Sequence, residues 1–265
     1  MNKYISLSKY PGRQGFYYYT EFFKLYNIDA TYEPLACADV EQSIKQAIED
    51  GVSGISISMP FKRAVIPLLN HRHPYIDLYN SCNTIKINQG ITQGYNADIA
   101  GVESVCKEIQ QGDKITILGA GAIGSMFVKY LEEQHYENLN VCTREAGTWN
   151  NRYGYSDVVI NCTALGTSTY ESPYKIGQIP PAARVVIDLA IKDNELQEQC
   201  KIARVKYISG REFYRSQFLK QFEIYTGIKP SEEVYNEIES KPVSYTHLRA
   251  HETGRNLVCR LLLEK

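Results

Sequence analysis

A run of small residues that follows an apolar segment constrains the fold of this chain more than any other feature. Residues 115–118 are Ile-Thr-Ile-Leu, a short strand pattern, and they lead into Gly119-Ala120-Gly121-Ala122-Ile123-Gly124. This is the glycine spacing of a strand–turn–helix unit that binds the pyrophosphate of a dinucleotide. The first glycine permits the sharp turn, the second lets the backbone approach the phosphates, and the third allows close packing of helix on strand. We therefore expect all six residues of the run to belong to a cofactor site at a helix N-terminus.

The residues after the second expected strand of this unit, 139–142, distinguish NAD from NADP. An NAD site usually has Asp or Glu at this position, which binds the ribose 2′-hydroxyl. Here the sequence is Thr143-Arg144-Glu145. The Arg144 guanidinium can pair with a 2′-phosphate through two hydrogen bonds, and Thr143 adds a hydroxyl, whereas Glu145 can bind the ribose hydroxyls instead. We expect NADP as the cofactor, with NAD as the alternative.

Short β-rich runs alternate with helical patterns along the chain. Strands are expected at 3–6, 30–35, 54–58, 115–118, 139–142, 157–162, 184–189 and 205–209, with a hairpin over 82–95. Helices are expected at 16–26, 39–48, 62–69, 99–111 and 122–134. Near-continuous apolar strands between helices indicate a parallel sheet covered on both faces. We expect an α/β protein of two domains, a doubly wound Rossmann-type cofactor domain and a smaller α/β substrate domain with a mixed sheet.

The expected domain limits follow from the positions of these patterns. Residues 1–99 would form the substrate-binding domain, completed by 217–242, and residues 100–216 the cofactor domain. Residues 243–265 change character abruptly and resemble the in-frame translation of a sequencing-library adapter. We expect this last segment to be non-native and leave it out of the fold.

Composition excludes several classes of function. The net charge is −1, and no apolar run approaches the roughly 18 residues of a membrane helix, so we expect neither nucleic acid nor a membrane as partner. The seven cysteines have no CxxC or metal-ligand spacing, which indicates reduced thiols in the cytoplasm and no metal site. The expected partner is a small-molecule substrate, bound by a monomer or a homodimer.

A lysine and an aspartate flank the expected hairpin. Lys62 closes the segment Ser-Met-Pro-Phe-Lys, and Asp98 closes Asn-Ala-Asp. Reduction of a ketone by hydride transfer creates an alkoxide that must be protonated, and a lysine can supply that proton when its surroundings tune its pKa. A neighbouring carboxylate would orient the ammonium. Upstream of a dinucleotide site, this pair predicts a small dehydrogenase with Lys62 as acid/base and Asp98 as its partner.

The sequence around this pair resembles the shikimate dehydrogenase family. The family's Asn-Val-Thr-x-Pro-x-Lys corresponds to 56–62, Val-Asn-Thr-Ile to 82–85, Asn-Thr-Asp-Gly to 96–99, Ile-Asn-Ala-Thr-x-x-Gly to 160–166, and Gly…Met-Leu-x-x-Gln to 210–217. The resemblance, which runs from about 50 to 235, implies NADP-dependent, reversible reduction of 3-dehydroshikimate to shikimate in aromatic amino acid biosynthesis. It implies that Ser58, Asn83 and Gln217 bind the substrate. It also adds Thr163 and Gly210 to the cofactor site.

The chain departs from the family where the substrate carboxylate would bind. The family's Ser-x-Ser-Pro, whose hydroxyls hold that group, is Arg13-Gln-Gly-Phe here, followed by three tyrosines. Arg13 offers a charged fork for a carboxylate, or a tyrosine hydroxyl replaces the serines. The Tyr of the family's Asp-Leu-x-Tyr is also missing. Two alternatives follow: a relative that oxidises quinate or another cyclic polyol carboxylate, and a non-catalytic, ligand-sensing member.

Overall fold

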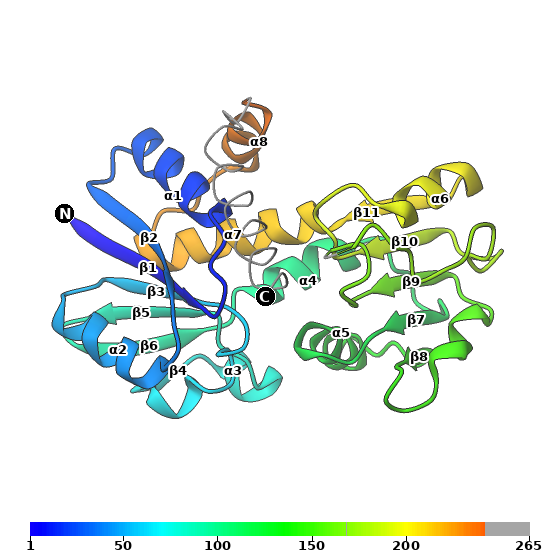
Figure 1. Cartoon of the computed structure of the whole chain (residues 1–265), viewed down its shortest axis with the longest axis horizontal. Helices are drawn as coiled ribbons and strands as arrows, with labels where there is room; N and C mark the ends of the chain where they lie inside the picture. Colours follow the sequence, from blue (N-terminus) through cyan, green and yellow to red (C-terminus); the bar gives the residue numbers. More distant parts are fainter. Residues whose placement is uncertain (168, 242–265) are drawn as a thin grey trace, which may run out of the picture.

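The structure, a computed structural model, describes residues 1–167 and 169–241 and contains two β-sheets that lie side by side (Figure 1). Six strands form the first sheet in the order β2-β1-β3-β5-β6-β4, and five form the second in the order β11-β10-β9-β7-β8. The segment 243–265, expected to be non-native, lies outside the described residues.

The first sheet is mixed, as expected. Its strands are β1 (Asn2–Ser8), β2 (Ala30–Ala36), β3 (Gly54–Ile57), β4 (His71–Arg72), β5 (Thr84–Asn88) and β6 (Ile91–Tyr95). β1 pairs in parallel with β2 and β3, whereas β5 runs antiparallel to both β3 and β6. Three helices of this half are α1 (Gln14–Leu25), α2 (Val40–Glu49) and α3 (Pro74–Tyr79).

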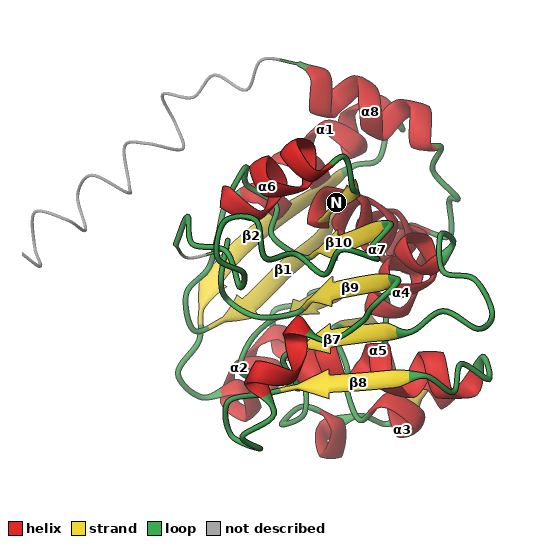
Figure 2. Ribbon diagram, turned by 90° about the vertical axis from the view of Figure 1, so that its right-hand side faces the viewer, coloured by secondary structure: helices red, strands yellow, loops and turns green. Residues whose placement is uncertain are grey.

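The second sheet is parallel throughout. Its strands are β7 (Ile115–Leu118), β8 (Leu139–Cys142), β9 (Val158–Asn161), β10 (Val185–Asp188) and β11 (Lys206–Ser209). Helices α4 (Asp98–Cys106) and α5 (Ala122–Glu133) pack on one face, and α6 (Glu195–Ala203) packs on the other (Figure 2). The strand order reverses between β7 and β9, which is the position where doubly wound sheets bind ligands, and the expected Rossmann-type arrangement is confirmed.

Two helices connect the halves. α4 and α7 (Gly210–Thr226) run between the two sheets (Figure 1), and α8 (Glu232–Ser240) follows α7. A Cβ on Gly101 would lie 2.8 Å from the backbone oxygen of Phe213, so glycine lets α4 and α7 approach closely. The C-terminal part of α7 returns to the first sheet, because Phe218 and Phe222 are buried against the aromatic residues of α1.

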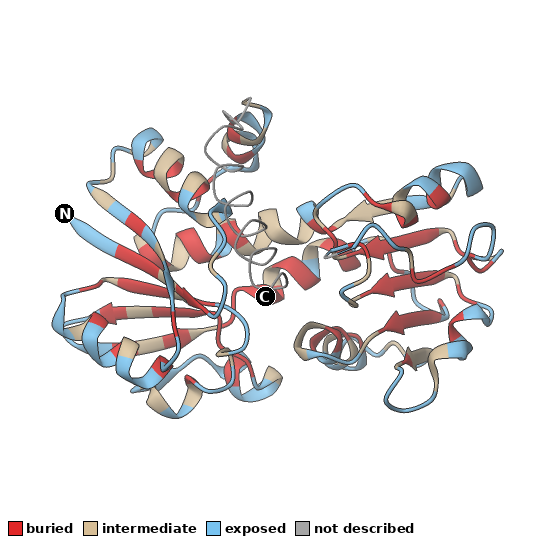
Figure 3. Ribbon diagram, viewed as in Figure 1, coloured by how far each residue is buried: buried red, intermediate tan, exposed pale blue. Residues whose placement is uncertain are grey.

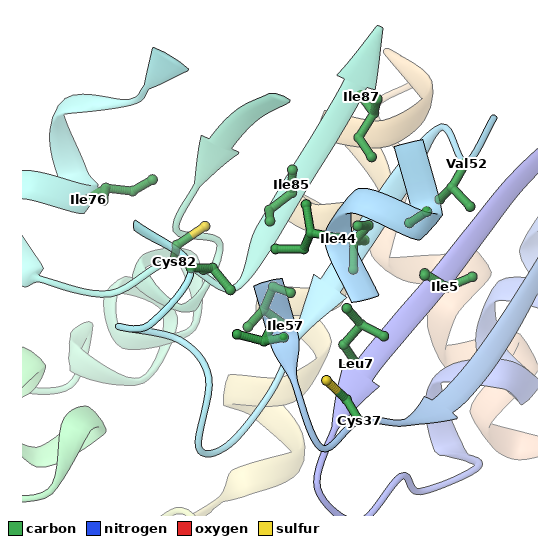
Figure 4. Close-up of a cluster of buried hydrophobic side chains, with 14 residues drawn as sticks. Ile5, Leu7, Cys37, Ile44, Val52, Ile57, Ile76, Cys82, Ile85 and Ile87 are labelled. Atoms are coloured by element: carbon green, nitrogen blue, oxygen red, sulfur yellow. The ribbon is translucent and has the colours of Figure 1, made fainter. Parts of the chain in front are cut away.

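Different side chains cover the two faces of the first sheet. On one face, Ile44 of α2 packs against Ile5, Leu7 and Ile57, and Figure 4 shows these side chains pointing toward one another. On the other face, α1, α7 and α8 enclose an aromatic cluster, whose buried members are Tyr4, Tyr18, Tyr19, Phe22, Phe23, Tyr32, Phe218, Phe222, Tyr225 and Tyr235. Figure 3 shows that burial is concentrated in the strands and in the inner sides of these helices.

The helix expected over 62–69 is absent. The chain there forms turns and one short 3-10 segment, Ile66–Leu68. Pro67 explains the difference, because it lacks the N–H that a helix would need and its ring would collide with the carbonyl one turn earlier. The structure also places α3 and the short β4 where the sequence had indicated only a loop. No helix within the described ranges is long and apolar enough to cross a membrane.

Candidate active site

Lys62 and Asp98 line one cavity of about 290 Å³. Besides this pair, its lining residues are Ser6, Gly12, Gln14, Gly15, Tyr19, Tyr32, Ser56, Ile57, Ser58, Asn83, Tyr214, Gln217, Phe218 and Gln221. These residues come from the first sheet and the loops that adjoin its strands, from α1 with the loop before it, and from α7. Most of them carry hydroxyl or amide groups, so the cavity suits a small ligand with several hydroxyls.

The two charged groups form a direct ion pair. Lys62 Nζ donates to Asp98 Oδ2 at 2.6 Å, and the side chains are only 16% and 5% exposed. Asp98 is the first residue of α4, where the helix dipole favours a carboxylate, and its backbone N–H donates to the side chain of Asn96. The carbonyl of Lys62 accepts from Cys82 N–H, which ties the lysine backbone to the hairpin. The local structure therefore presents both groups to one cavity.

Asn83 lies beside this pair and is 3% exposed. Its Oδ1 accepts from Thr84 Oγ1 at 2.7 Å and from Ala97 N–H at 2.8 Å. Among the described residues, no partner accepts from the Asn83 amide nitrogen, which is therefore available to donate to a ligand oxygen.

Gln221 connects Asn83 with the far wall of the cavity. Its Nε2 donates to the backbone oxygen of Asn83 at 3.1 Å and to Thr84 Oγ1 at 2.8 Å. Its Oε1 accepts from Tyr19 Oη at 2.9 Å and from Ser56 Oγ at 3.1 Å. A single buried amide on α7 thus uses all of its hydrogen-bonding positions to join α1, β3 and the hairpin.

A second cavity, of about 580 Å³, lies at the carboxyl ends of β7, β8 and β9. Its lining residues are Gly119, Ala120, Gly121, Cys142, Thr143, Arg144, Glu145, Ala146, Trp149, Cys162, Thr163, Ala164, Leu165 and Thr169. Burial raises the pKa of the Cys162 thiol, so this thiol stays protonated near neutral pH. The position matches the ligand site of a doubly wound sheet.

The glycines of the fingerprint fit a dinucleotide. Gly119 has φ +90°, a left-handed conformation that favours glycine. A Cβ on Gly124 would lie 2.1 Å from the Gly119 carbonyl oxygen, so glycine is required where α5 meets β7. A Cβ on Gly121 would meet nothing within 4 Å, which leaves room for a phosphate beside the backbone. The turn therefore has the shape that a pyrophosphate requires.

This cavity contains a cation beside an aromatic ring. The Arg144 guanidinium lies 5.4 Å from the centre of the Trp149 ring. Thr143 Oγ1 accepts from Ala146 N–H at 3.0 Å, which closes the turn after β8. Arg144 and Glu145 are both exposed and line the cavity.

A buried carboxylate supports the opposite wall. Thr163 donates to Asn161 Oδ1 at 2.7 Å, and Asn161 Nδ2 donates to Asp188 Oδ1 at 2.9 Å. Asp188 is fully buried and also accepts from Asn194 and Tyr207. This network fixes the loop that carries Thr163.

The structure brings most of the predicted residues to one of the two cavities. Lys62, Asp98, Ser58, Asn83 and Gln217 line the first, and Gly119, Ala120, Gly121, Thr143, Arg144 and Thr163 line the second. The remaining fingerprint residues, Ala122, Ile123 and Gly124, form the first turn of α5 behind it. Two residues lie elsewhere. Arg13 is exposed and does not line the first cavity, and Gly210 is buried where a Cβ would lie 2.3 Å from the Leu189 carbonyl oxygen.

Several lining residues were not predicted from the sequence. Gln221 follows Gln217 by four positions on α7, so helical spacing alone places both on one face. Tyr32 and Tyr214 carry no local motif and could be found only from the fold. Trp149 is the single tryptophan of the chain and lies five residues after Arg144. Its closeness to a predicted site residue can be seen in the sequence.

Comparison with known proteins matches the chain to shikimate dehydrogenases. A family model described as the shikimate dehydrogenase substrate binding domain matches residues 15–85. A shikimate dehydrogenase-like protein of Haemophilus influenzae is 25% identical over 254 residues, covering 88% of this chain and 93% of the relative. The NADP(+) shikimate dehydrogenase of Pyrococcus abyssi is 25% identical over 236 residues, covering 82% and 88%.

Solved structures agree on the fold. Shikimate 5-dehydrogenase from Thermus thermophilus, in complex with NADP(H) and shikimate, superposes with a TM-score of 0.78 at 18% identity. The match covers 90% of this chain and 98% of that one. With the mixed and parallel sheets and the two cavities, these matches agree with the resemblance noted in the sequence: the chain is similar to shikimate dehydrogenases in sequence and in fold over most of its length.

Proposed function

We propose that the chain catalyses the NADP-dependent, reversible reduction of 3-dehydroshikimate to shikimate in the cytoplasm. The observation that carries this proposal is the Lys62–Asp98 ion pair, 2.6 Å long, inside a cavity lined by hydroxyl and amide groups. A separate cavity carries the dinucleotide fingerprint. The NADP(+) shikimate dehydrogenases among its relatives support this reading.

Each half has its own task in this proposal. Residues 1–99 with 217–242 bind the substrate, and residues 100–216 bind the cofactor. Gly119 and Gly121 leave the backbone accessible to the pyrophosphate, while Thr143 and Arg144 hold the 2′-phosphate. Bound NADPH supplies the hydride. Everything else in the reaction depends on side chains of the first cavity.

Lys62 moves the proton in this mechanism. Its ammonium donates a proton to the ketone oxygen during reduction and takes it back during oxidation. Asp98 accepts a hydrogen bond from Lys62 Nζ and thereby fixes the direction of the ammonium. Ser58, Asn83 and Gln217 bind the ring hydroxyls, and the Asn83 amide nitrogen has no competing acceptor among the described residues.

A turnover assay tests the proposal. The protein truncated after Lys241 is incubated with NADP or NAD and with shikimate or quinate, and nicotinamide absorbance at 340 nm is followed. We expect turnover with shikimate and a preference for NADP. Faster turnover with quinate would favour the alternative that the chain oxidises quinate or another cyclic polyol carboxylate. The absence of hydroxyls at positions 13 and 15 supports this alternative. If neither acid is oxidised with either cofactor, the proposed reaction is wrong.

A further inference from the structure

Gln221 fixes the direction of the hydrogen bonds around the substrate cavity. The backbone oxygen of Asn83 can only accept, so the Gln221 atom facing it must be the amide nitrogen. The amide oxygen of Gln221 then faces Tyr19 and Ser56, and both hydroxyls must donate to it. One backbone carbonyl therefore determines the orientation of the whole network.

In the wall formed by Tyr19, Tyr32 and Ser56, the two phenol oxygens consequently keep lone pairs that can accept from a ligand. Ser56 gives its hydrogen to Gln221, so its oxygen accepts from Tyr32 Oη at 3.0 Å and from Tyr225 Oη at 3.0 Å. All of these hydroxyl hydrogens are engaged within the protein. Such a wall accepts hydrogen bonds from substrate hydroxyls and offers a carboxylate no donor.

The position of the family's second serine cannot supply that donor either. Residue 15 is glycine, and a Cβ built there would lie 3.3 Å from Tyr32 Oη, closer than ordinary contact. A serine would therefore require the Tyr32 hydroxyl to move by a few tenths of an ångström. Tyr32 is held by its hydrogen bond to Ser56, which opposes such a movement.

Two other lining residues have donors that remain available. The Tyr214 hydroxyl and the Gln14 side-chain amide have no hydrogen bond to any residue in the described part of the chain, and both line the cavity. Tyr214 lies beside α1, because its ring centre is 5.9 Å from that of Tyr18. Burial raises the pKa of Tyr214, so the phenol keeps its proton and remains a donor.

We propose that Tyr214 and Gln14 bind the carboxylate of the substrate, while the phenol oxygens of Tyr19 and Tyr32 accept a substrate hydroxyl. This rests on the proposed function, because it assumes a ligand that carries both groups. Lys62 stays paired with Asp98 at the reacting oxygen, and Gln217 keeps its role at the ring hydroxyls. The subsite replaces two serine hydroxyls by a phenol and an amide from different helices.

The test compares Tyr214→Phe with the matched variant Tyr18→Phe. Both substitutions remove one phenolic hydroxyl from the same aromatic cluster, but Tyr18 does not line the cavity. Loss of a hydrogen bond to a charged group raises KM and Kd by about 10- to 100-fold. We expect Tyr214→Phe to show this rise for shikimate with kcat nearly unchanged. For the uncharged methyl ester of shikimate, the KM and Kd of the parent protein and of both variants should agree within about twofold, because a neutral ester gains little from this donor.

Calorimetric Kd values for both ligands, measured with NADP present, separate this proposal from the proposed function. If shikimate is not oxidised but still binds more tightly than its ester, and Tyr214→Phe removes that preference, the subsite stands and the proposed reaction fails. If shikimate is oxidised and Tyr214→Phe matches the parent protein, the subsite is wrong and the reaction stands. Equal losses with acid and ester would indicate a structural role for Tyr214 and overturn the proposal. Absence of both binding and turnover would overturn both proposals.

Discussion

A backbone hydrogen bond holds Lys62 in place as well as its ion pair, so its side chain can be replaced without removing what fixes this segment. Cys82 N–H donates to the Lys62 carbonyl at 2.8 Å whatever side chain stands there. Replacing Lys62 by Met removes the proton donor and keeps most of the volume. We expect kcat to fall by about 10²- to 10⁴-fold, the usual contribution of a general acid. Steady-state kinetics with shikimate and NADP measure this.

Cofactor binding provides the control for this variant. The dinucleotide cavity does not include Lys62, so the Kd for NADPH, followed by the fluorescence of its reduced nicotinamide, should change less than about twofold. Asp98→Asn retains the shape of the partner and should lower kcat less than Lys62→Met. Unchanged kcat in Lys62→Met would refute the assigned role.

The individual site residues differ in how far the sequence could predict them. Lys62, Asn83 and Asp98 lie in short local motifs that resemble those of one family, so the resemblance could indicate that they share a cavity. Tyr32 and Tyr214 enter that cavity from segments about 180 residues apart. No local spacing records such a meeting, because it depends on how α7 returns to the first sheet. Arg13 shows the converse: it has suitable chemistry for a carboxylate, but its side chain is exposed outside the cavity lining.

Two glycines of the strand–turn–helix element should respond in opposite ways when alanine replaces them. Gly124→Ala would place a Cβ 2.1 Å from the Gly119 carbonyl oxygen, so α5 must move away from β7. We expect a loss of about 1–3 kcal/mol in the free energy of unfolding, as for other overpacked sites. Gly121→Ala would meet no atom within 4 Å, and φ is −66° there, so the fold should tolerate it.

The same pair distinguishes packing from ligand binding. Because Gly121 faces open space in the cofactor cavity, its methyl group would occupy the phosphate position and weaken NADP binding. Urea unfolding and NADP titration of both variants check this. A stable Gly124→Ala protein, or a Gly121→Ala protein with normal NADP affinity, would contradict the geometry of the turn.

At the level of elements, apolar periodicity predicted well where a strand or helix is regular. The strands β7, β9 and β10 of the second sheet are buried on both faces, so their near-continuous apolar runs could be recognised in the sequence. The helix expected over 62–69 is absent, because Pro67 lies inside that segment and interrupts a helix. The α4–α7 contact was not predictable, since it depends on Gly101 meeting the backbone of Phe213 more than a hundred residues later.

For the whole molecule, the aromatic cluster links the substrate cavity to the C-terminal helices. Tyr19 and Phe218 line the cavity and also belong to the cluster that buries Tyr235 of α8. Tyr19 and Tyr32 stack with their ring centres 4.2 Å apart. Substrate binding and the stability of the first half therefore depend on the same rings, so conditions that ionise buried tyrosines should affect both.

This arrangement predicts a loss of stability in alkali. Burial raises the pKa of Tyr19, Tyr225 and Tyr235 above the ordinary value of about 10. The unfolded chain releases these protons above pH 10 while the folded protein retains them. The contribution of these tyrosines to the free energy of unfolding is therefore complete below pH 10 and is lost as the pH rises further. Each such group lowers the free energy of unfolding by about 1.4 kcal/mol per pH unit in this range.

Urea unfolding between pH 8 and 11, with tyrosinate absorbance at 295 nm, measures how the free energy of unfolding changes with pH. Tyr235→Phe should reduce the slope of the free energy of unfolding against pH by the contribution of about one tyrosine. Tyr10→Phe, at a side chain that is 70% exposed, serves as the control. A flat profile up to pH 11 would show that the cluster ionises without unfolding.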